Sequence, residues 1–386
     1  MKALVFDQKN GSWEDTSGFE KADVPTPTID EAKNPTDAEA VIIKVHYAGV
    51  CGSDRGIWFR QAFKDQILGS LTREKKTARV IGHESFGEIV ELGSAAGKKY
   101  NLKKGDFVSC ESHVICQNCF QCKLGEVHVC TNEKILGISV DGCFAEYFKV
   151  PGHIVWKTDT SKIRPEIGGV QEPFGNAVHA ASKTPLAGKT IAIFGLGPIG
   201  LFLTLVARGL GAKHIIGIEP NPVSQEMAKR LGIDYCLSLP PRDKKIPAHH
   251  RDEAVVKNIE ELTGGLGVDV AFEMSGYNSS FNNALFSTRR GGQVIAFGIK
   301  SGDFTLEDYN RFIVRGLTVH AVIGRRLPET WKITTALLEN PANKIQENIW
   351  NIILERGKDT ILPVGDYTKD VFAEKMAKHP KILLQF

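Results

Sequence analysis

The feature that most constrains this chain is the stretch from Thr190 to Glu219, which reads TIAIFGLGPIGLFLTLVARGLGAKHIIGIE. Five residues of strand character, Thr190 to Phe194, run directly into Gly195-Leu-Gly-Pro-Ile-Gly200, and an apolar run of helical character follows. A second strand-like run, 214–218, then ends at Glu219. This order of strand, glycine-rich turn, helix and strand predicts a β-α-β unit that binds a dinucleotide.

The glycines and the acid of this unit have separate physical roles. Gly195 allows the tight turn, Gly197 lets the backbone approach a pyrophosphate, and Gly200 lets the helix pack closely on its strand. The free N–H groups and the dipole at the start of the helix favour phosphate. The carboxylate of Glu219 can accept hydrogen bonds from a ribose diol and repels a 2'-phosphate, which favours NAD over NADP. The predicted cofactor-binding residues are Gly195, Gly197, Pro198, Ile199, Gly200 and Glu219.

Length and charge exclude several classes of protein. At 386 residues the chain is long enough for two or three domains, and its net charge of +3 is too small to indicate nucleic acid or a membrane surface as partner. Residues 190–207 carry no charge, but their glycines and Pro198 favour a buried core over a membrane span. The N-terminus turns polar after six residues and lacks the apolar core of a signal peptide, so we expect a cytoplasmic location.

Four of the eight cysteines are bunched in one short stretch with the spacing C-x2-C-x2-C-x7-C. Four thiolates on such a loop can surround Zn²⁺ tetrahedrally and leave no open position, which predicts a structural zinc site. An iron-sulfur cluster or a redox dithiol is the alternative. The bacterial ferredoxin spacing, however, has three residues before its last cysteine and a proline after it, whereas this chain has seven and then Thr131. The predicted structural zinc ligands are Cys116, Cys119, Cys122 and Cys130.

Other polar residues stand where strand-like runs end. Cys51 and Ser53 follow the β-branched run 40–50, where side chains can converge on a site. His83 and Glu84 follow a glycine and begin another strand-like run, although a His-Glu pair alone is more typical of a surface or core dipeptide than of a metal site. Glu172 precedes Pro173 at the start of a helix, so its carboxylate could point into a cleft.

Beyond Glu219 strands alternate with helices, which predicts a doubly wound parallel sheet. The expected strands are 233–237, 268–273, 293–297 and 317–322. The tail contains an amphipathic helix and the terminal strand KILLQF, and we expect it to return to the first domain. The sequence therefore predicts an α/β protein with a catalytic domain at 1–185, a zinc lobe at about 110–131, a Rossmann NAD-binding domain at 186–322 and a returning segment at 323–386.

These motifs together resemble the zinc-dependent medium-chain alcohol dehydrogenase superfamily along almost the whole chain. The resemblance rests on GVCGSD (49–54), GHE (82–84), the four-cysteine lobe and FGLGPIG (194–200), in that order. Within the superfamily it is strongest to the L-threonine 3-dehydrogenases, through ESHVICQNC (111–119), DGCFAEY (141–147), QEPFGNAVH (171–179) and GRRLPETW (324–331), and polyol dehydrogenases share some of these features. The resemblance implies a β-rich, GroES-like catalytic domain and a homodimer or homotetramer.

The resemblance also implies a catalytic zinc held by Cys51 and His83, with Glu84 as a third ligand or close partner and Glu172 lining the same site. Zinc lowers the pKa of an alcohol's hydroxyl group, Ser53 accepts its hydrogen bond, and the nicotinamide takes the hydride. Two further histidines, His113 and His179, match positions of the threonine dehydrogenases; each is otherwise typical of a packed or capping residue. Arg325 or Arg326 could bind a substrate carboxylate or a cofactor amide, or form a solvated basic pair.

Three departures from the threonine dehydrogenases stand out. Gly56 occupies the position of a histidine that continues their proton relay. The 32 residues from Cys51 to His83 form a longer segment than in most of them, whose extra residues are expected near the cleft mouth; residues 58–79 are predicted to be a surface loop or short helix. Ser224 stands where many relatives have an arginine.

We therefore expect an NAD-dependent zinc alcohol dehydrogenase that oxidises a secondary alcohol, with L-threonine 3-dehydrogenase as the single best hypothesis. A polyol or sugar dehydrogenase of the sorbitol or glucose type is the alternative within the enzyme class. A catalytically silent NAD(H)-binding redox sensor is the alternative outside it, and the full set of zinc-site residues weighs against a sensor.

Overall fold

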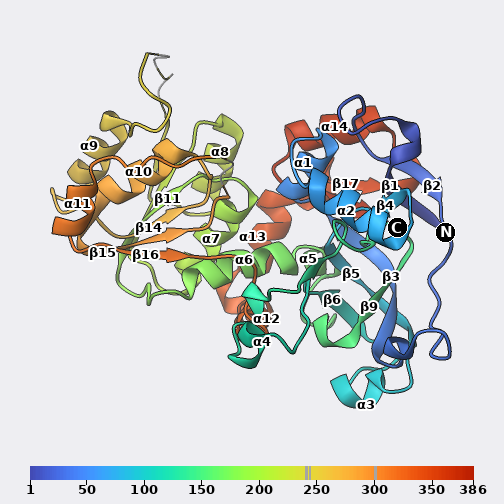
Figure 1. The fold of residues 1–386 in the computed structure, drawn as a ribbon. Coiled ribbons are helices and arrows are strands. Elements are labelled where there is room, and N and C mark those ends of the chain that lie inside the picture. Colours follow the sequence, from blue (N-terminus) through green and yellow to red (C-terminus); the bar gives the residue numbers. More distant parts are fainter. Residues whose placement is uncertain (240–241, 243–244, 300–301) are drawn as a thin grey trace. The chain divides into compact units, whose positions relative to one another are not determined.

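The computed structural model describes residues 1–239, 242, 245–299 and 302–386, and these divide into two compact units (Figure 1). Unit 1 consists of Met1–Pro173, Arg325–Glu339 and Leu354–Phe386; unit 2 consists of Phe174–Gly324 and Asn340–Ile353. The sequence placed the boundaries after residues 185 and 322. In the structure the first boundary lies earlier, within helix α6 (Gln171–Ala181), and residues 340–353 belong to unit 2 because they pack against helix α7 (Pro198–Gly209).

Unit 1 is built on a largely antiparallel sheet with the strand order β10-β6-β5-β3-β18-β17, in which β9 also pairs with β3. These strands are β3 (Ala40–Gly49), β5 (Glu84–Leu92), β6 (Phe107–Cys110), β9 (Tyr147–Pro151), β10 (Val155–Lys157), β17 (Ile361–Pro363) and β18 (Leu383–Gln385). Smaller sheets join β1 (Lys2–Asp7) to β2 (Glu20–Asp23) and β4 (Ala78–Val80), and β7 (His113–Val114) to β8 (Lys134–Ile135). The last strand, β18, pairs with β3 so that Leu383 lies opposite Gly49.

Short helices surround this sheet, and aromatic side chains fill the core beside it. The helices are α1 (Gly52–Trp58), α2 (Lys64–Glu74), α3 (Ala96–Tyr100), α4 (Phe120–Lys123), α5 (Pro165–Gly168), α12 (Glu329–Glu339) and α14 (Lys369–Lys378). The ring of Trp58 lies 5.2 Å from that of Phe19 and 4.9 Å from that of Phe372, measured between centroids. Contacts of this kind join the start of the chain to its last helix.

The segment between Cys51 and His83 is part of the core of unit 1. Its helix α2 buries Ile67 and Leu71, and the fully buried Arg79 donates hydrogen bonds to Ser70 Oγ at 2.9 Å and Asp141 Oδ1 at 2.9 Å. Of the predicted alternatives for 58–79, the short helix is found at Lys64–Glu74, but its position at the surface was wrong, because one face of α2 is apolar and buried.

Unit 2 contains the predicted parallel sheet, with the strand order β13-β12-β11-β14-β15-β16 and parallel pairing throughout. Its strands are β11 (Thr190–Phe194), β12 (His214–Ile218), β13 (Tyr235–Leu237), β14 (Val268–Glu273), β15 (Thr288–Ala296) and β16 (Thr318–Ala321). Its helices, besides α7, are α8 (Pro222–Arg230), α9 (Glu253–Leu262), α10 (Asn278–Ser287), α11 (Tyr309–Val314) and α13 (Ile345–Asn348). The central strands are almost entirely apolar because helices cover both faces of such a sheet.

The order of the strands reverses between β11 and β14, and ligands of doubly wound folds bind at such a switch point. The glycine-rich turn after β11 lies at this point. Among the described residues, no helix has the length and the apolar character that crossing a bilayer demands.

Candidate metal and dinucleotide sites

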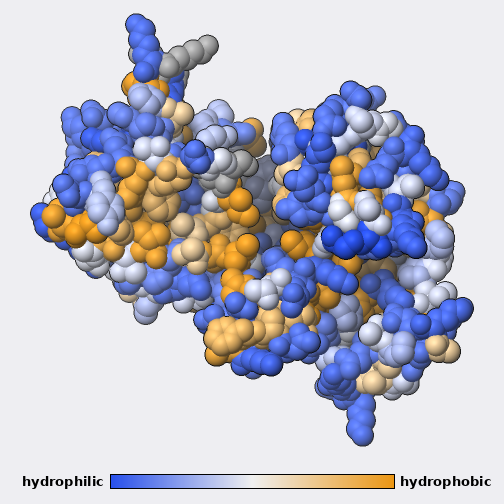
Figure 2. Space-filling model, in the orientation of Figure 1, coloured by the Kyte–Doolittle hydropathy of each residue, from blue (hydrophilic) through white to orange (hydrophobic). Residues whose placement is uncertain are grey.

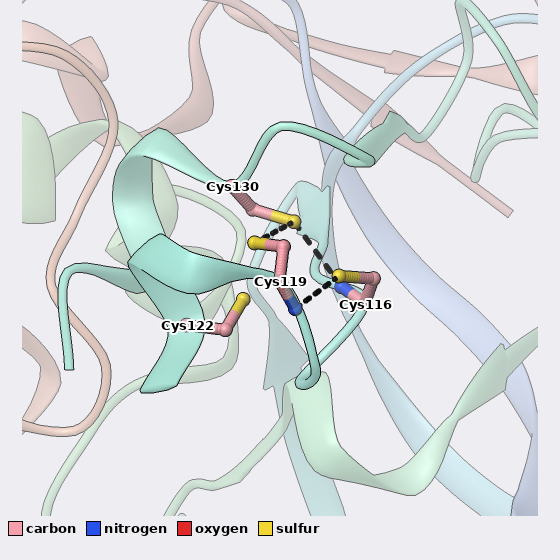
Figure 3. Close-up of side chains that lie close together, drawn as sticks. All are labelled: Cys116, Cys119, Cys122 and Cys130. Carbon is pink, nitrogen blue, oxygen red and sulfur yellow. Dashed lines mark hydrogen bonds between the residues drawn. The ribbon is translucent and has the colours of Figure 1, made fainter. Parts of the chain in front are cut away.

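The four-cysteine lobe brings its sulfur atoms to one point. Figure 3 shows the side chains of Cys116, Cys119, Cys122 and Cys130 turned toward one another, and their sulfur atoms lie within 4.8 Å of each other. All are free thiols rather than disulfides. The backbone N–H groups of Cys116 and Cys119 donate to the sulfurs of Cys130 and Cys116, each at 3.3 Å, and the N–H of Cys122 lowers the pKa of the Cys119 thiol to about 5. N–H donors that stabilise thiolates, in a group of this size, fit a tetrahedral zinc ion.

A second group is formed by Cys51, His83 and Glu84, whose ligand atoms also lie within 4.8 Å of one another. The pairing of β3 with β5 brings them together, because Gly49 lies opposite Glu84 and Cys51 follows two residues later. A Cβ at Gly49 would overlap the Glu84 carboxylate, so this register requires a glycine. The Oε1 atom of Glu84 is buried and has no hydrogen-bond partner, which leaves it available to a cation.

The other oxygen of Glu84 is held by a lysine from the end of the chain. Lys381 Nζ donates to Glu84 Oε2 and, at 3.0 Å, to the carbonyl of Val50, and both charged side chains are fully buried. Burial raises the pKa of Glu84, and the charge of Lys381 opposes that rise. The sequence analysis missed Lys381, since a lysine in the run KILLQF reads as a solvated edge.

Asp54 supports this group and was also missed. Its Oδ2 accepts the N–H of Cys51 at 2.8 Å, and its Oδ1 lies 3.7 Å from Nδ1 of His83. Burial acts to lower the pKa of His83, but Asp54, followed by Cys51 and Glu172, raises it to about 10. Surroundings that favour an imidazolium also favour a cation bound to the ring, and a carboxylate behind a metal-binding histidine orients it. The sequence signal that could have identified Asp54 is its position three residues after Cys51, from which its carboxylate can accept the N–H of Cys51.

Glu172 lies outside the group of three. In the first turn of α6, its Oε1 is 2.7 Å from Nη2 of Arg325. Gln171 anchors this turn by donating to Ser109 Oγ at 3.0 Å and Thr158 Oγ1 at 2.8 Å. The charge of Glu172 nevertheless reaches the group, since it contributes to raising the pKa of His83 and of Glu84.

Ser53 is the predicted hydroxyl beside the metal group, and its Oγ lies 3.4 Å from Nε2 of His83. One turn later on α1, a Cβ at Gly56 would stand 2.9 Å from the Cβ of Ala62. The carbonyl of Gly56 also accepts N–H bonds from Gln61 at 2.7 Å and Ala62 at 3.3 Å. The turn after α1 therefore occupies the space that a side chain at Gly56 would need.

Each of the two remaining histidines makes a polar contact within the protein. His113 Nδ1 is 2.7 Å from Glu133 Oε2, and His179 Nδ1 is 2.8 Å from the carbonyl oxygen of Gly324. The second contact fastens the residue before Arg325. Arg326 is part-buried at the start of the segment leading to α12, and its N–H donates to Thr330 Oγ1 at 3.0 Å.

The glycine-rich turn has the geometry its sequence predicts. Gly195 has φ +98°, and a Cβ there would stand 2.9 Å from Ser275; a Cβ at Gly200 would overlap the carbonyl of Gly195. Gly197 is the N-cap of α7, and a Cβ there would meet no atom within 4 Å. Gly195 and Gly200 are thus needed for packing, whereas Gly197 borders open space at a helix N-terminus, where a pyrophosphate fits.

Glu219 ends β12 and faces this turn. Its Oε2 accepts the N–H of Leu196 at 2.7 Å, and its Oε1 accepts that of Asn221 at 2.8 Å. Each oxygen keeps a further acceptor position, which a ribose diol can use. Ser224, where many relatives have an arginine, is buried in α8.

Comparisons with known proteins match both the first part of the chain and its parallel-sheet part to dehydrogenase families. The family described as "Zinc-binding dehydrogenase" matches residues 198–340, and "Alcohol dehydrogenase GroES-like domain" matches residues 37–160. The chain is 37% identical over 341 residues to L-threonine 3-dehydrogenase of Bacillus velezensis, covering 88% of each chain, and 35% identical over 320 residues to that of Pyrococcus horikoshii, covering 83% of each.

Solved structures show the same fold over the whole chain. Alcohol dehydrogenase TADH from Thermus sp. ATN1 is 22% identical with a TM-score of 0.78, and 2R,3R-butanediol dehydrogenase from Bacillus subtilis is 25% identical with a TM-score of 0.76. In each case the match covers 100% of this chain and 99% of the other.

Substitution should distinguish the glycine that is needed for packing from the one that borders the pyrophosphate position. We expect Gly200→Ala to lower the free energy of unfolding by about 2 kcal/mol, because its Cβ meets backbone. Gly197→Ala should keep the melting temperature but weaken NAD binding about tenfold, because the methyl group enters the space left for pyrophosphate. Thermal unfolding and titration calorimetry with NAD measure both effects. Equal losses of stability in the two variants would contradict these roles.

The buried Glu111 should make the free energy of unfolding depend on pH in the acid range. Burial acts to raise its pKa, but Arg325, followed by His113 and Trp331, lowers it to about 2, below the unfolded value of about 4.3. Its stabilisation is therefore present above pH ~4.3 and lost as the pH falls toward 2. We expect Glu111→Gln to reduce the free energy of unfolding by about 3 kcal/mol at pH 7, with the difference from wild type shrinking below pH ~4.3.

Urea unfolding at several pH values measures this dependence. Glu14→Gln is the matched control, since Glu14 makes an exposed ion pair with Lys64 and its loss should change little. A wild-type advantage over Glu111→Gln that stays constant down to pH ~2 would exclude an ionised Glu111 as its source.

Proposed function

This chain belongs to the zinc-dependent medium-chain alcohol dehydrogenases, and we propose that it is an L-threonine 3-dehydrogenase, which oxidises the secondary alcohol of L-threonine to 2-amino-3-oxobutyrate with NAD. The observation that carries the proposal is the group of Cys51, His83 and Glu84, in which one buried carboxylate oxygen has no partner. The substrate rests on the similarity to L-threonine 3-dehydrogenases over 88% of the chain.

The residues fit zinc at both metal sites, since thiolate, imidazole and carboxylate are its ordinary ligands. The group of Cys51, His83 and Glu84 leaves a coordination position for substrate, whereas the four-cysteine group does not. When bound, zinc supplies Lewis acidity to the substrate hydroxyl, and NAD accepts the hydride. Cys51, His83 and Glu84 would hold the catalytic ion, and Cys116, Cys119, Cys122 and Cys130 the structural one.

The protein's own groups handle the proton and the orientation of the ligands. Ser53 Oγ, beside His83, would accept the hydrogen bond of the substrate hydroxyl and relay its proton, taking that proton while giving up its own. Asp54 keeps Nδ1 of His83 on its own side, so that Nε2 faces the site. Because the turn at Ala62 closes the Gly56 position, no imidazole can stand there, and the proton from Ser53 would pass to water or to a ribose hydroxyl of the bound cofactor.

The substrate's carboxylate needs a cation other than Arg325. That guanidinium is 3% exposed and already lies between the carboxylates of Glu111 and Glu172. An arginine so paired cannot also form the bidentate contact that recognises a free carboxylate. Arg325 is therefore not available as a substrate ligand.

We also propose a homo-oligomer formed through strand β16. This strand ends the sheet of unit 2, and Thr318, Val319 and Ala321 on it are exposed. Figure 2 shows hydrophobic residues gathered over α11 and β16, where Tyr309 and Val314 are more than 60% exposed. An open strand edge beside an apolar surface suits pairing with a second copy across a two-fold axis.

The substrate test is the rate of NADH formation by zinc-loaded protein with L-threonine, sorbitol, glucose and simple secondary alcohols. We expect kcat/KM for L-threonine to exceed that of the other alcohols at least about a hundredfold. Protein groups that pair with the amine and carboxylate of threonine would be left unpaired by an alcohol that lacks them. Preference for sorbitol or glucose would move the protein to the polyol or sugar dehydrogenases. Tight NAD(H) binding with no turnover of any alcohol would support a redox sensor.

Two cysteine variants control this test. Cys51→Ala should abolish turnover, with the melting temperature and NAD binding retained. Cys122→Ser should lower the melting temperature and should halve the zinc content, because one of the two ions is lost. Full activity of Cys51→Ala would refute the catalytic group.

The oligomer should depend on the edge strand. Val319→Lys is expected to convert the dimer or tetramer to smaller species, because it places a charge on the pairing strand. Leu266→Lys is the control. This residue of unit 2 is 71% exposed and lies outside α11 and β16, so its substitution should leave the mass of the oligomer unchanged. Light scattering after size exclusion gives the mass; a Val319→Lys protein of unaltered mass would place the interface elsewhere.

A further inference from the structure

A buried cluster of charges lies beside the Cys51 group in unit 1. Arg325 makes two contacts with Glu111, one of them from Nε to Oε2 at 2.8 Å, and its Nη2 lies 2.7 Å from Glu172 Oε1. All three residues are at most 3% exposed. Two carboxylates thus share one guanidinium, in surroundings where an uncompensated charge is costly.

Arg325 is fixed by contacts from several elements. Glu111 follows β6, and its carboxylate also accepts Trp331 Nε1 of α12 at 3.0 Å and the N–H of His113 at 3.2 Å. Ser112 Oγ accepts a further bond from Arg325 at 2.7 Å. These contacts hold the guanidinium in one orientation, so it can determine where its second carboxylate partner lies.

The two acids near the metal group are therefore held differently. Lys381 holds one oxygen of Glu84 and leaves Oε1, buried and unpartnered, with the ligand atoms of Cys51 and His83. Glu172 lies outside this group of ligand atoms, and its Oε1 is engaged by Arg325. A carboxylate oxygen bonded to a guanidinium is a weaker ligand, and the cation of Arg325 also repels a metal ion on that side.

We propose that Arg325 is a positioning residue, which withholds Glu172 from the catalytic metal and so leaves Glu84 as the third protein ligand in the resting site. This inference rests on the proposed function, since it requires a metal at Cys51 and His83. If Arg325 had a purely structural role, it would pair with the two buried acids without affecting which residues bind the metal.

The first test uses Co²⁺ in place of zinc, because the visible absorption of Co²⁺ reports the number and type of its ligands. Loaded Cys51→Ala protein, whose signal comes from the four-cysteine site, is subtracted to isolate the catalytic ion. We expect Glu172→Gln to keep the wild-type Co²⁺ spectrum and Glu84→Gln to change it. The opposite pattern, or a spectrum changed by both variants, would overturn the proposal.

The second test releases Glu172. Arg325→Met with Glu111→Gln removes one charge of each sign, and we expect weaker, five-coordinate Co²⁺ bands and about tenfold tighter metal binding in chelator competition, because Glu172 joins the ligands. Adding Glu172→Gln to this double variant should restore the wild-type spectrum and affinity. Bands that persist after Glu172→Gln, or a double variant with wild-type spectrum and affinity, would leave Arg325 a structural residue only.

These outcomes separate the inference from the function on which it rests. If wild-type protein shows no Co²⁺ signal beyond that of Cys51→Ala, the metal group itself is wrong. If that signal is present but Arg325 has no influence on it, the metal group remains and the positioning role fails. Arg325→Lys, which keeps the charge, should retain the wild-type spectrum and serves as the matched control for folding.

Discussion

The architecture of unit 1 depends on positive charges that compensate the acids buried beside its metal group. Glu84 requires Lys381, and Glu111 and Glu172 require Arg325. Breaking such a buried pair costs several kcal/mol, because the remaining charge has no water around it. Both cations come from the last part of the chain, so the tail must return to unit 1 before the metal group is electrostatically complete. The pairing of β18 with β3 places Lys381 at this position.

Much of unit 2 was predictable because its signals are local. The strand expected at 268–273 is β14, with the same bounds, and the turn from Gly195 to Gly200 has the backbone and contacts that its glycines indicate. Likewise, the spacing of the four cysteines suffices to place their sulfurs together, since a short loop brings them within reach. A parallel strand buried on both faces and a glycine needed for φ above zero leave marks within a few residues.

The parts that could not be predicted depend on contacts distant in sequence. Lys381 and Glu84 are 297 residues apart, and nothing near either residue reveals the partner. The buried Arg79 is a further example. An arginine that follows two lysines (75–76) is typical of a surface, but hydrogen bonds to Ser70 and Asp141 compensate its burial in the core. Asp54 is an intermediate case, since its place after Cys51 is local but its action on His83 arises only when β3 and β5 pair.

The same electrostatic requirement bears on how one site can contain two carboxylates and one catalytic ion. If both acids were free, the ion would draw both in and lose the open position that a substrate hydroxyl needs. Lys381 engages one oxygen of Glu84 and leaves the other to the metal group. Arg325, by contrast, is held by Glu111, whose carboxylate also accepts a hydrogen bond from Trp331, and it keeps Glu172 on the protein's side. The division between the acids therefore arises from where each cation is anchored, because the carboxylates themselves are chemically alike.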